Sequence, residues 1–170
     1  MGAKMMPEDQ VMKIFDEARD VVHVIWQDEA RALLCAIAWQ ESRCTARVQY
    51  GGPAHGLWQF EKGGGVHGVI RHSVTLMLAR EACSKRNVIC SDDAVYEALP
   101  HDDVLAAVFA RLLISTLPAK LPTRDQQGEA WNQYIDAWRP GVPRPETWPE
   151  AWRRGWEAVD RWKLRDDNQD

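Results

Sequence analysis

The chain has 170 residues, of which 45% are hydrophobic, and it carries 21 Lys and Arg against 25 Asp and Glu. This length suits one globular domain with a sizeable core and is short for two, so we expect a single domain over residues 1–170 with a frayed tail over about 165–170. The formal charge of -4 leaves no overall basic field, which argues against nucleic acid as a partner.

Residues 1–10 contain no apolar run of the kind that an export signal has, so we expect synthesis in the cytoplasm. The longest apolar stretches elsewhere are shorter than a bilayer requires, and no stable membrane insertion is expected. Cysteines in such a chain are expected to be reduced thiols, although a disulfide between Cys83 and Cys90 after release from the cell stays open. The four cysteines are Cys35, Cys44, Cys83 and Cys90.

Helical spacing of apolar residues predicts a first helix from Pro7 to about Gln27. Asp28 can cap a second helix, which is apolar on nearly all sides, so this helix should be buried. Its polar end is Gln40-Glu41-Ser42. Over residues 43–68 the periodicity fails and glycine is dense, which predicts a long connection of the kind that is commonly functional.

Within this connection, Gly56-Leu57-Trp58-Gln59-Phe60 is an apolar island that should pack inward and carry Gln59 with it. Helical patterns resume over about 66–86, in a short piece after Ser91, and over 102–116. Two further helices are expected over 125–138 and about 146–163, and on the second Trp148, Trp152 and Trp156 should form one packing seam. The predicted fold is mainly α, with about six or seven helices and a glycine-rich loop.

Glu41 stands at the end of the buried helix, two residues after Trp39. Apolar surroundings raise the pKa of a glutamate, because loss of water disfavours its charged form. A Glu that stays protonated near neutral pH can donate its proton to a glycosidic oxygen, which is the general-acid step of glycan cleavage. An ordinary solvated residue at a helix end is the alternative, and this pattern by itself favours neither.

Three segments carry a resemblance to a known family: Ala38-Trp39-Gln40-Glu41-Ser42, Gly56-Leu57-Trp58-Gln59-Phe60, and Trp131-Asn132-Gln133-Tyr134 followed by Trp138-Arg139-Pro140-Gly141. Together they resemble the lysozyme-like superfamily, in particular its lytic transglycosylase and goose-type lysozyme branch and the small lysozyme-like proteins of tailed bacteriophages. The resemblance spans most of the chain, from Trp39 to Gly141. It implies a lysozyme-like domain with a glycan groove.

By this resemblance Glu41 is the catalytic acid and Ser42 lies in the groove. Leu57, Trp58 and Gln59 belong to a segment that is similar to the family's Gly-Leu-Met-Gln, whose backbone and Gln line the groove opposite the acid. The family's late Tyr-Asn-x-Gly element has a tyrosine that approaches the catalytic Glu, which implies that place for Tyr134. This last match is loose, because no Asn follows Tyr134.

Further substrate contacts are expected from His55, which precedes the Gly-Leu-Trp-Gln-Phe segment, and from Trp58 and Trp138, whose aromatic faces could cover sugar rings. Glu61 is the candidate for a second catalytic carboxylate, against the alternative of a surface Glu paired with Lys62. We favour chemistry with a single Glu. The cysteines and histidines lack close paired spacing, so we expect neither a metal nor a cofactor.

The expected function is cleavage of the β-1,4 bond between N-acetylmuramic acid and N-acetylglucosamine in peptidoglycan, as a phage lytic transglycosylase. Three alternatives stay open: a hydrolytic muramidase that uses Glu61 or water, a chitinase-like hydrolase, and a non-catalytic virion or glycan-binding module. Expected partners are peptidoglycan glycan strands and, for a virion component, other virion proteins. The protein would reach the cell wall through a lysis pore or as part of a virion.

Overall fold

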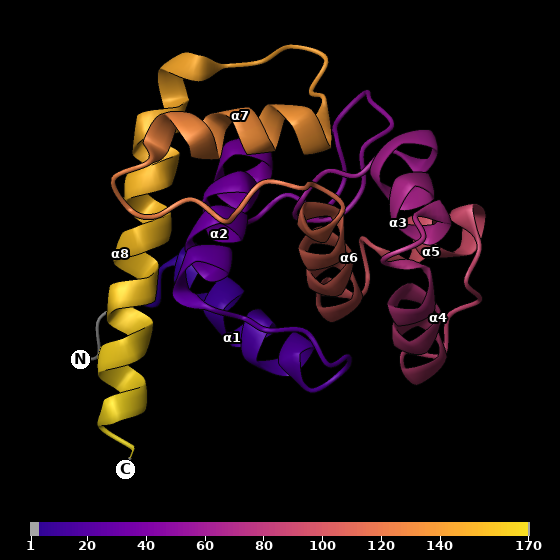
Figure 1. Ribbon diagram of the computed structural model, residues 1–170, viewed down its shortest axis with the longest axis horizontal. Coiled ribbons are helices and arrows are strands. Elements are labelled where there is room, and N and C mark those ends of the chain that lie inside the picture. Colours follow the sequence, from indigo (N-terminus) through magenta and orange to yellow (C-terminus); the bar gives the residue numbers. More distant parts are fainter. Residues whose placement is uncertain (1–3, 170) are drawn as a thin grey trace.

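The computed structural model describes residues 4–169, which fold into eight α-helices (Figure 1). The helices are α1 (Pro7–Arg19), α2 (Asp28–Ser42), α3 (His67–Arg71), α4 (Leu76–Lys85), α5 (Asp92–Ala98), α6 (Asp103–Ser115), α7 (Gln127–Trp138) and α8 (Trp148–Asp167). A short π-helical segment, η1 (Lys62–Val66), precedes α3, and a 3-10 turn, η2 (Pro145–Thr147), precedes α8. Isolated β-bridges occur in these residues but no strand. The mainly α prediction is confirmed, with more helices than expected.

The helix α2 forms the centre of the core, and every residue from Ala32 to Ala38 is completely buried. It packs most extensively against α8, while α3, α4 and α5 lie on the far side of α6 from α8 (Figure 1). Gly155 of α8 allows this close approach, because a Cβ at that position would lie 2.3 Å from the carbonyl oxygen of Ala32. A helix that is apolar on all sides is stable only when neighbours cover it, as they do here.

Ion pairs join α8 to α1. Arg154 Nη1 lies 2.7 Å from Glu8 Oε1, and Arg161 Nε and Arg165 Nη2 lie 2.9 and 2.7 Å from Asp9 Oδ1. Burial would raise the pKa of Asp9, but the two arginines outweigh it and hold that pKa below its usual value. The helix α8 continues to Asp167, beyond the predicted end at about Lys163, and Arg161 and Arg165 join its last turns to Asp9. The frayed tail from about residue 165 stays a prediction. Residue 170 of that tail lies outside the described residues.

The first helix ends at Arg19 and does not reach Gln27 as predicted. Val21 and Val22 are buried as their spacing indicated, but Ile25 is 74% exposed. Four of the five residues 21–25 are β-branched, which lowers the helix propensity of this segment, and the Ile25 carbonyl accepts hydrogen bonds from Arg111 Nε and Nη2 at 3.1 and 3.0 Å. A side chain therefore satisfies a backbone group that a longer helix would have paired.

The other helices follow the prediction with shifted ends. The pattern over 66–86 is divided between α3 and α4, and the Thr75 hydroxyl donates to the Val69 carbonyl at 2.7 Å in the break between them. Asp102 caps α6 by accepting from the Leu105 amide at 2.9 Å. The predicted seam is confirmed, since Trp148, Trp152 and Trp156 are 2%, 4% and 8% exposed.

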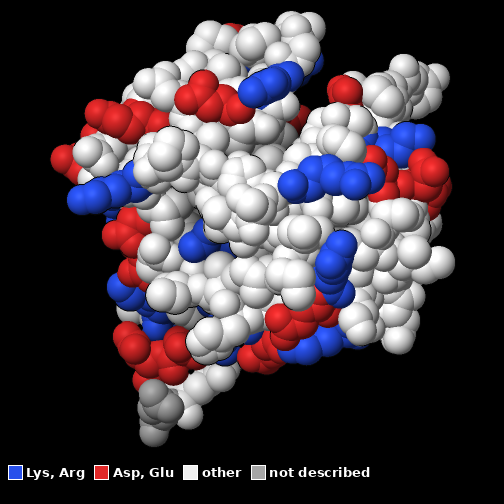
Figure 2. All heavy atoms as spheres, turned by 45° about the vertical axis from the view of Figure 1, so that its right-hand side comes forward, with Lys and Arg blue, Asp and Glu red and all other residues white. Residues whose placement is uncertain are grey.

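Lys and Arg side chains alternate with Asp and Glu over the face drawn in Figure 2, without a broad field of one sign. None of the helices among the described residues is both long and apolar enough to cross a membrane. All four cysteines are free thiols.

Candidate functional site

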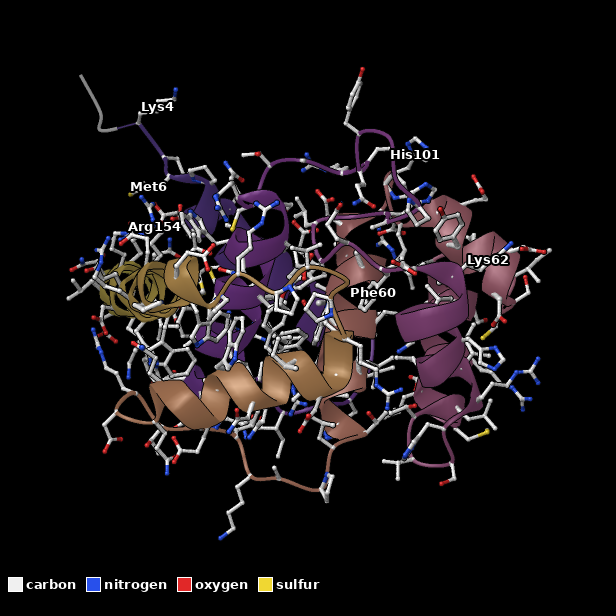
Figure 3. The ribbon with its side chains drawn as sticks, turned by 90° about the horizontal axis from the view of Figure 1, so that it is seen from above. Lys4, Met6, Phe60, Lys62, His101 and Arg154 are labelled. Carbon is white, nitrogen blue, oxygen red and sulfur yellow. The ribbon has the colours of Figure 1, made fainter. Side chains whose placement is uncertain are left out.

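A cleft of about 1080 Å³ opens where the end of α2 meets α7 and the glycine-rich connection. Residues after α6 and the loop 139–144 complete its walls. Figure 3 looks down on this region, with Phe60 beside the C-terminal end of α7. Five of the sequence-predicted site residues line the cleft: Glu41, Gln59, Glu61, Tyr134 and Trp138.

Glu41 and Tyr134 both line the cleft and are joined there, since the Tyr134 hydroxyl donates a hydrogen bond to Glu41 Oε1. The Tyr134 ring is 3% exposed and stacks on Trp148 with centroids 5.3 Å apart and planes 5° apart. The ring of Trp131 meets it edge-on at 5.5 Å. The tryptophan seam thus holds the tyrosine in place, and the tyrosine orients the carboxyl group.

Burial raises the pKa of Glu41 above its ordinary value. The hydrogen bond from Tyr134 and the positive charge of Arg144 act in the opposite direction and offset only part of this effect. Burial, together with the nearby Glu41 charge, also raises the pKa of Tyr134, so its hydroxyl remains a donor. Glu41 is therefore held by a hydrogen bond inside the cleft, and its carboxyl group favours the protonated form more than a solvated glutamate at a helix end does.

Replacing Tyr134 by Phe is expected to raise the pKa of Glu41 further, because the hydrogen bond that favours its charged form is lost. A carboxyl ¹³C NMR titration of the purified protein measures this pKa directly. Tyr96→Phe serves as the control, since the Tyr96 hydroxyl donates to the Pro53 carbonyl and not to Glu41. An unchanged or lowered Glu41 pKa in Tyr134→Phe would contradict the assigned contact.

A tight turn at residues 55–60 presents Gln59 to the cleft. The amides of His55 and Phe60 donate to each other's carbonyl oxygens at 2.9 and 2.8 Å, which closes the turn. Gly56 has a φ of 79° and Gln59 a φ of 50°, and a Cβ at Gly56 would lie 3.3 Å from Leu99 Cβ. The Gln59 amide group is held in place because its Nε2 donates to the Gly56 carbonyl at 2.8 Å.

The same turn sends Leu57 and Trp58 into the core, so the prediction that they line the groove is wrong for their side chains. Leu57 is 1% exposed and Trp58 is 0% exposed. The Trp58 indole donates from Nε1 to the Leu34 carbonyl at 2.8 Å and packs near Phe15. A ring that is closed off in this way cannot cover a sugar, whereas its neighbour Gln59 reaches the cleft.

Ser42 and His55 do not line the cleft, and their side chains instead contact other segments of the protein. The Ser42 hydroxyl, which is buried, donates to the Leu57 carbonyl at 2.6 Å, with the Ala38 carbonyl at 2.9 Å as a second acceptor. It therefore fastens the end of α2 to the turn that carries Gln59. His55 stacks on Tyr96 at 3.8 Å, and its Nδ1 lies 2.9 Å from the Tyr96 carbonyl oxygen. Both residues support the site from outside it, which corrects their prediction as substrate contacts.

Trp138 and Glu61 do reach the cleft. Trp138 Nε1 donates to the Trp58 carbonyl at 2.8 Å, and the Trp138 ring stacks on Phe60 at 5.7 Å. Glu61 is exposed at the cleft edge. Its expected pairing with Lys62 is wrong, because Lys62 Nζ lies 2.8 Å from Asp93 Oδ1 instead.

Sequence reasoning missed Gln40 and Arg144. Gln40 Nε2 donates to the Arg144 carbonyl at 2.9 Å, and the Thr147 hydroxyl donates to Gln40 Oε1 at 2.9 Å. These bonds hold the loop 139–147 over the end of α2 and keep the Arg144 charge close to Glu41. In the sequence, only the prolines at 140, 143 and 145 indicate that this loop has a fixed conformation, because proline restricts the backbone.

Among residues 4–169, no three His, Cys, Asp or Glu side chains come together in a way that could hold a metal ion. Comparison with protein-family models, with curated proteins and with solved structures found no match to this chain.

Proposed function

We propose that this protein cleaves the β-1,4 bond between N-acetylmuramic acid and N-acetylglucosamine in bacterial peptidoglycan, with Glu41 as the proton donor. The observation that carries the proposal is the Glu41 carboxyl in a large cleft, oriented by the buried Tyr134 and with a raised pKa. The resemblance of the segments around Glu41, Gln59 and Tyr134 to the lysozyme-like superfamily supports the same chemistry. Gln59 and Trp138 supply an amide and an aromatic edge in the same cleft for sugar contacts.

In the proposed reaction, protonated Glu41 gives its proton to the glycosidic oxygen while the bond from that oxygen to C1 of the muramic sugar breaks. The leaving sugar departs with a free 4-hydroxyl group, and positive charge develops at C1. Glu41, now a carboxylate, accepts the proton of the nucleophile that attacks C1. That nucleophile is the 6-hydroxyl of the same muramic sugar in a transglycosylase and water in a lysozyme.

We favour the transglycosylase outcome, in which Glu41 serves as both acid and base. The hydrolytic muramidase is the second candidate, and Glu61 is the observation that favours it, because a second carboxylate lines the same cleft. Glu61 is exposed and belongs to the glycine-rich wall, whereas Glu41 is held by Tyr134.

Digestion of purified sacculi tests the function and the outcome together. Mass spectrometry of the soluble products should find 1,6-anhydromuramic ends if the muramic sugar attacks itself, and reducing ends if water attacks. Chitin is the parallel substrate, and faster cleavage of chitin would favour the chitinase-like alternative. Failure to release soluble fragments from sacculi would contradict the proposal.

A further inference from the structure

Two histidines that the proposed chemistry does not use lie in the same cleft as Glu41. His67 is the first residue of α3, and His72 directly follows its last. Both line the cleft. In Figure 1, α3 lies apart from α2, and the two histidines line the cleft from the two ends of α3 whereas Glu41 lines it from the end of α2.

Hydrogen bonds determine which ring nitrogen of each histidine remains available. His67 Nδ1 lies 2.7 Å from Asp92 Oδ2, so Nδ1 carries the proton that is donated to the carboxylate, and Nε2 is the ring nitrogen left to accept a hydrogen bond when it carries no proton. His72 Nδ1 accepts from the Val74 amide at 3.2 Å, so the neutral ring carries its proton on Nε2. The cleft wall therefore offers one acceptor and one donor.

We propose that His67 and His72 form a subsite for an N-acetylated sugar of the glycan strand, away from the bond that is cut. An N-acetylhexosamine has hydroxyl and amide N–H donors for His67 Nε2, and hydroxyl and carbonyl oxygens that accept from His72 Nε2. Asp92 orients the His67 ring in the way that carboxylates commonly orient functional histidines. This inference rests on the proposed function, since it adds a second contact to the same strand.

A purely structural role for the His67–Asp92 contact is the competing explanation, because it joins the wall of the cleft to α5. The neighbouring Lys62–Asp93 ion pair, at 2.8 Å, joins η1 to α5 in the same way. Figure 3 places Lys62 beside α5. Neither Lys62 nor Asp93 lines the cleft, so their pair is a matched control for the structural role.

The experiment measures binding without cleavage, in a protein that carries Glu41→Gln. Intrinsic tryptophan fluorescence follows titration with the N-acetylglucosamine hexamer and with peptide-free glycan strands prepared from sacculi. His67→Asn is added to this parent, because the Asn amide keeps an N–H for Asp92 and removes the nitrogen at Nε2. Loss of one hydrogen bond should weaken binding of both probes about five- to tenfold. Lys62→Met in the same parent should change the dissociation constant by less than about twofold, since a solvent-exposed ion pair contributes little.

Equal affinity of His67→Asn and its parent would overturn the subsite, as would an equally large loss in Lys62→Met. A parent that binds neither probe would also overturn it. The proposed function is judged separately, by cleavage of sacculi by the protein with Glu41 intact. A parent that binds glycan through His67, together with an intact protein that releases no fragments, would therefore refute the cleavage and leave the subsite standing.

Discussion

Glu41→Gln is expected to lower the rate of fragment release from sacculi by about 10³-fold, within the range that a general acid contributes. Gln has nearly the same shape as Glu and can still accept the hydrogen bond from Tyr134, but it has no proton to transfer to the glycosidic oxygen. The rate is measured as soluble muropeptides released over time. Full activity in Glu41→Gln would refute the assigned role.

Glu61→Gln is the matched control, because Glu61 is the other glutamate of the cleft. A single-Glu mechanism predicts that this variant keeps most of the activity. Equal inactivity of the two variants would instead support the hydrolytic muramidase with a second carboxylate.

The stability of Glu41→Gln distinguishes lost chemistry from lost structure. Because burial raises the pKa of Glu41 in the folded protein, the contribution of this group to folding stability is fully present below its unfolded pKa and is lost as pH rises through the raised folded pKa. Gln does not titrate, so it avoids the cost of the buried charge above that pKa. The melting temperature of Glu41→Gln at neutral pH should therefore equal or exceed that of the parent, and a lower value would indicate that activity was lost through unfolding.

Gly155→Ala should lower the free energy of unfolding by about 3 kcal/mol, at the upper end of what overpacking typically costs. Its Cβ would lie 2.3 Å from Ala32 O and 3.1 Å from Ala36 N, which are backbone atoms of α2 and cannot rotate away. The two helices would have to separate, and α2 carries Glu41 at its end. Chemical denaturation followed by tryptophan fluorescence measures the loss.

Gly128→Ala provides the control, because a Cβ on this glycine of α7 would meet no atom within 4 Å. Ala in a helix is favoured over Gly by about 0.5–1 kcal/mol, so this variant should be as stable as the parent or slightly more stable. Equal stability of the two variants would contradict the close α2–α8 contact.

The spacing of apolar residues predicted a helix correctly where the same residues are buried in the folded protein. The all-round apolar sequence of residues 28–39 predicted a buried helix, and the spacing of Trp148, Trp152 and Trp156 predicted the seam that now supports Tyr134. The pairing of Glu41 with Tyr134 was expected from the resemblance, and the hydrogen bond between them agrees with it. Where apolar spacing ran on past Arg19, a β-branched segment and the Arg111 side chain ended the helix early.

Local periodicity indicated where most of the helices lie and which faces they bury, because the 3.6-residue period is contained within a single segment. It did not indicate where the first helix ends or that residues 66–86 form two helices. Tertiary structure alone decided what reaches the cleft. The left-handed backbone at Gln59 separates a cleft residue from its buried neighbour Trp58, although the two are adjacent in sequence. Arg144 and Gln40 are 104 residues apart, and His67 and Asp92 are 25 apart. Contacts between residues so far apart in sequence depend on how the helices pack, and residue spacing within one segment does not predict them.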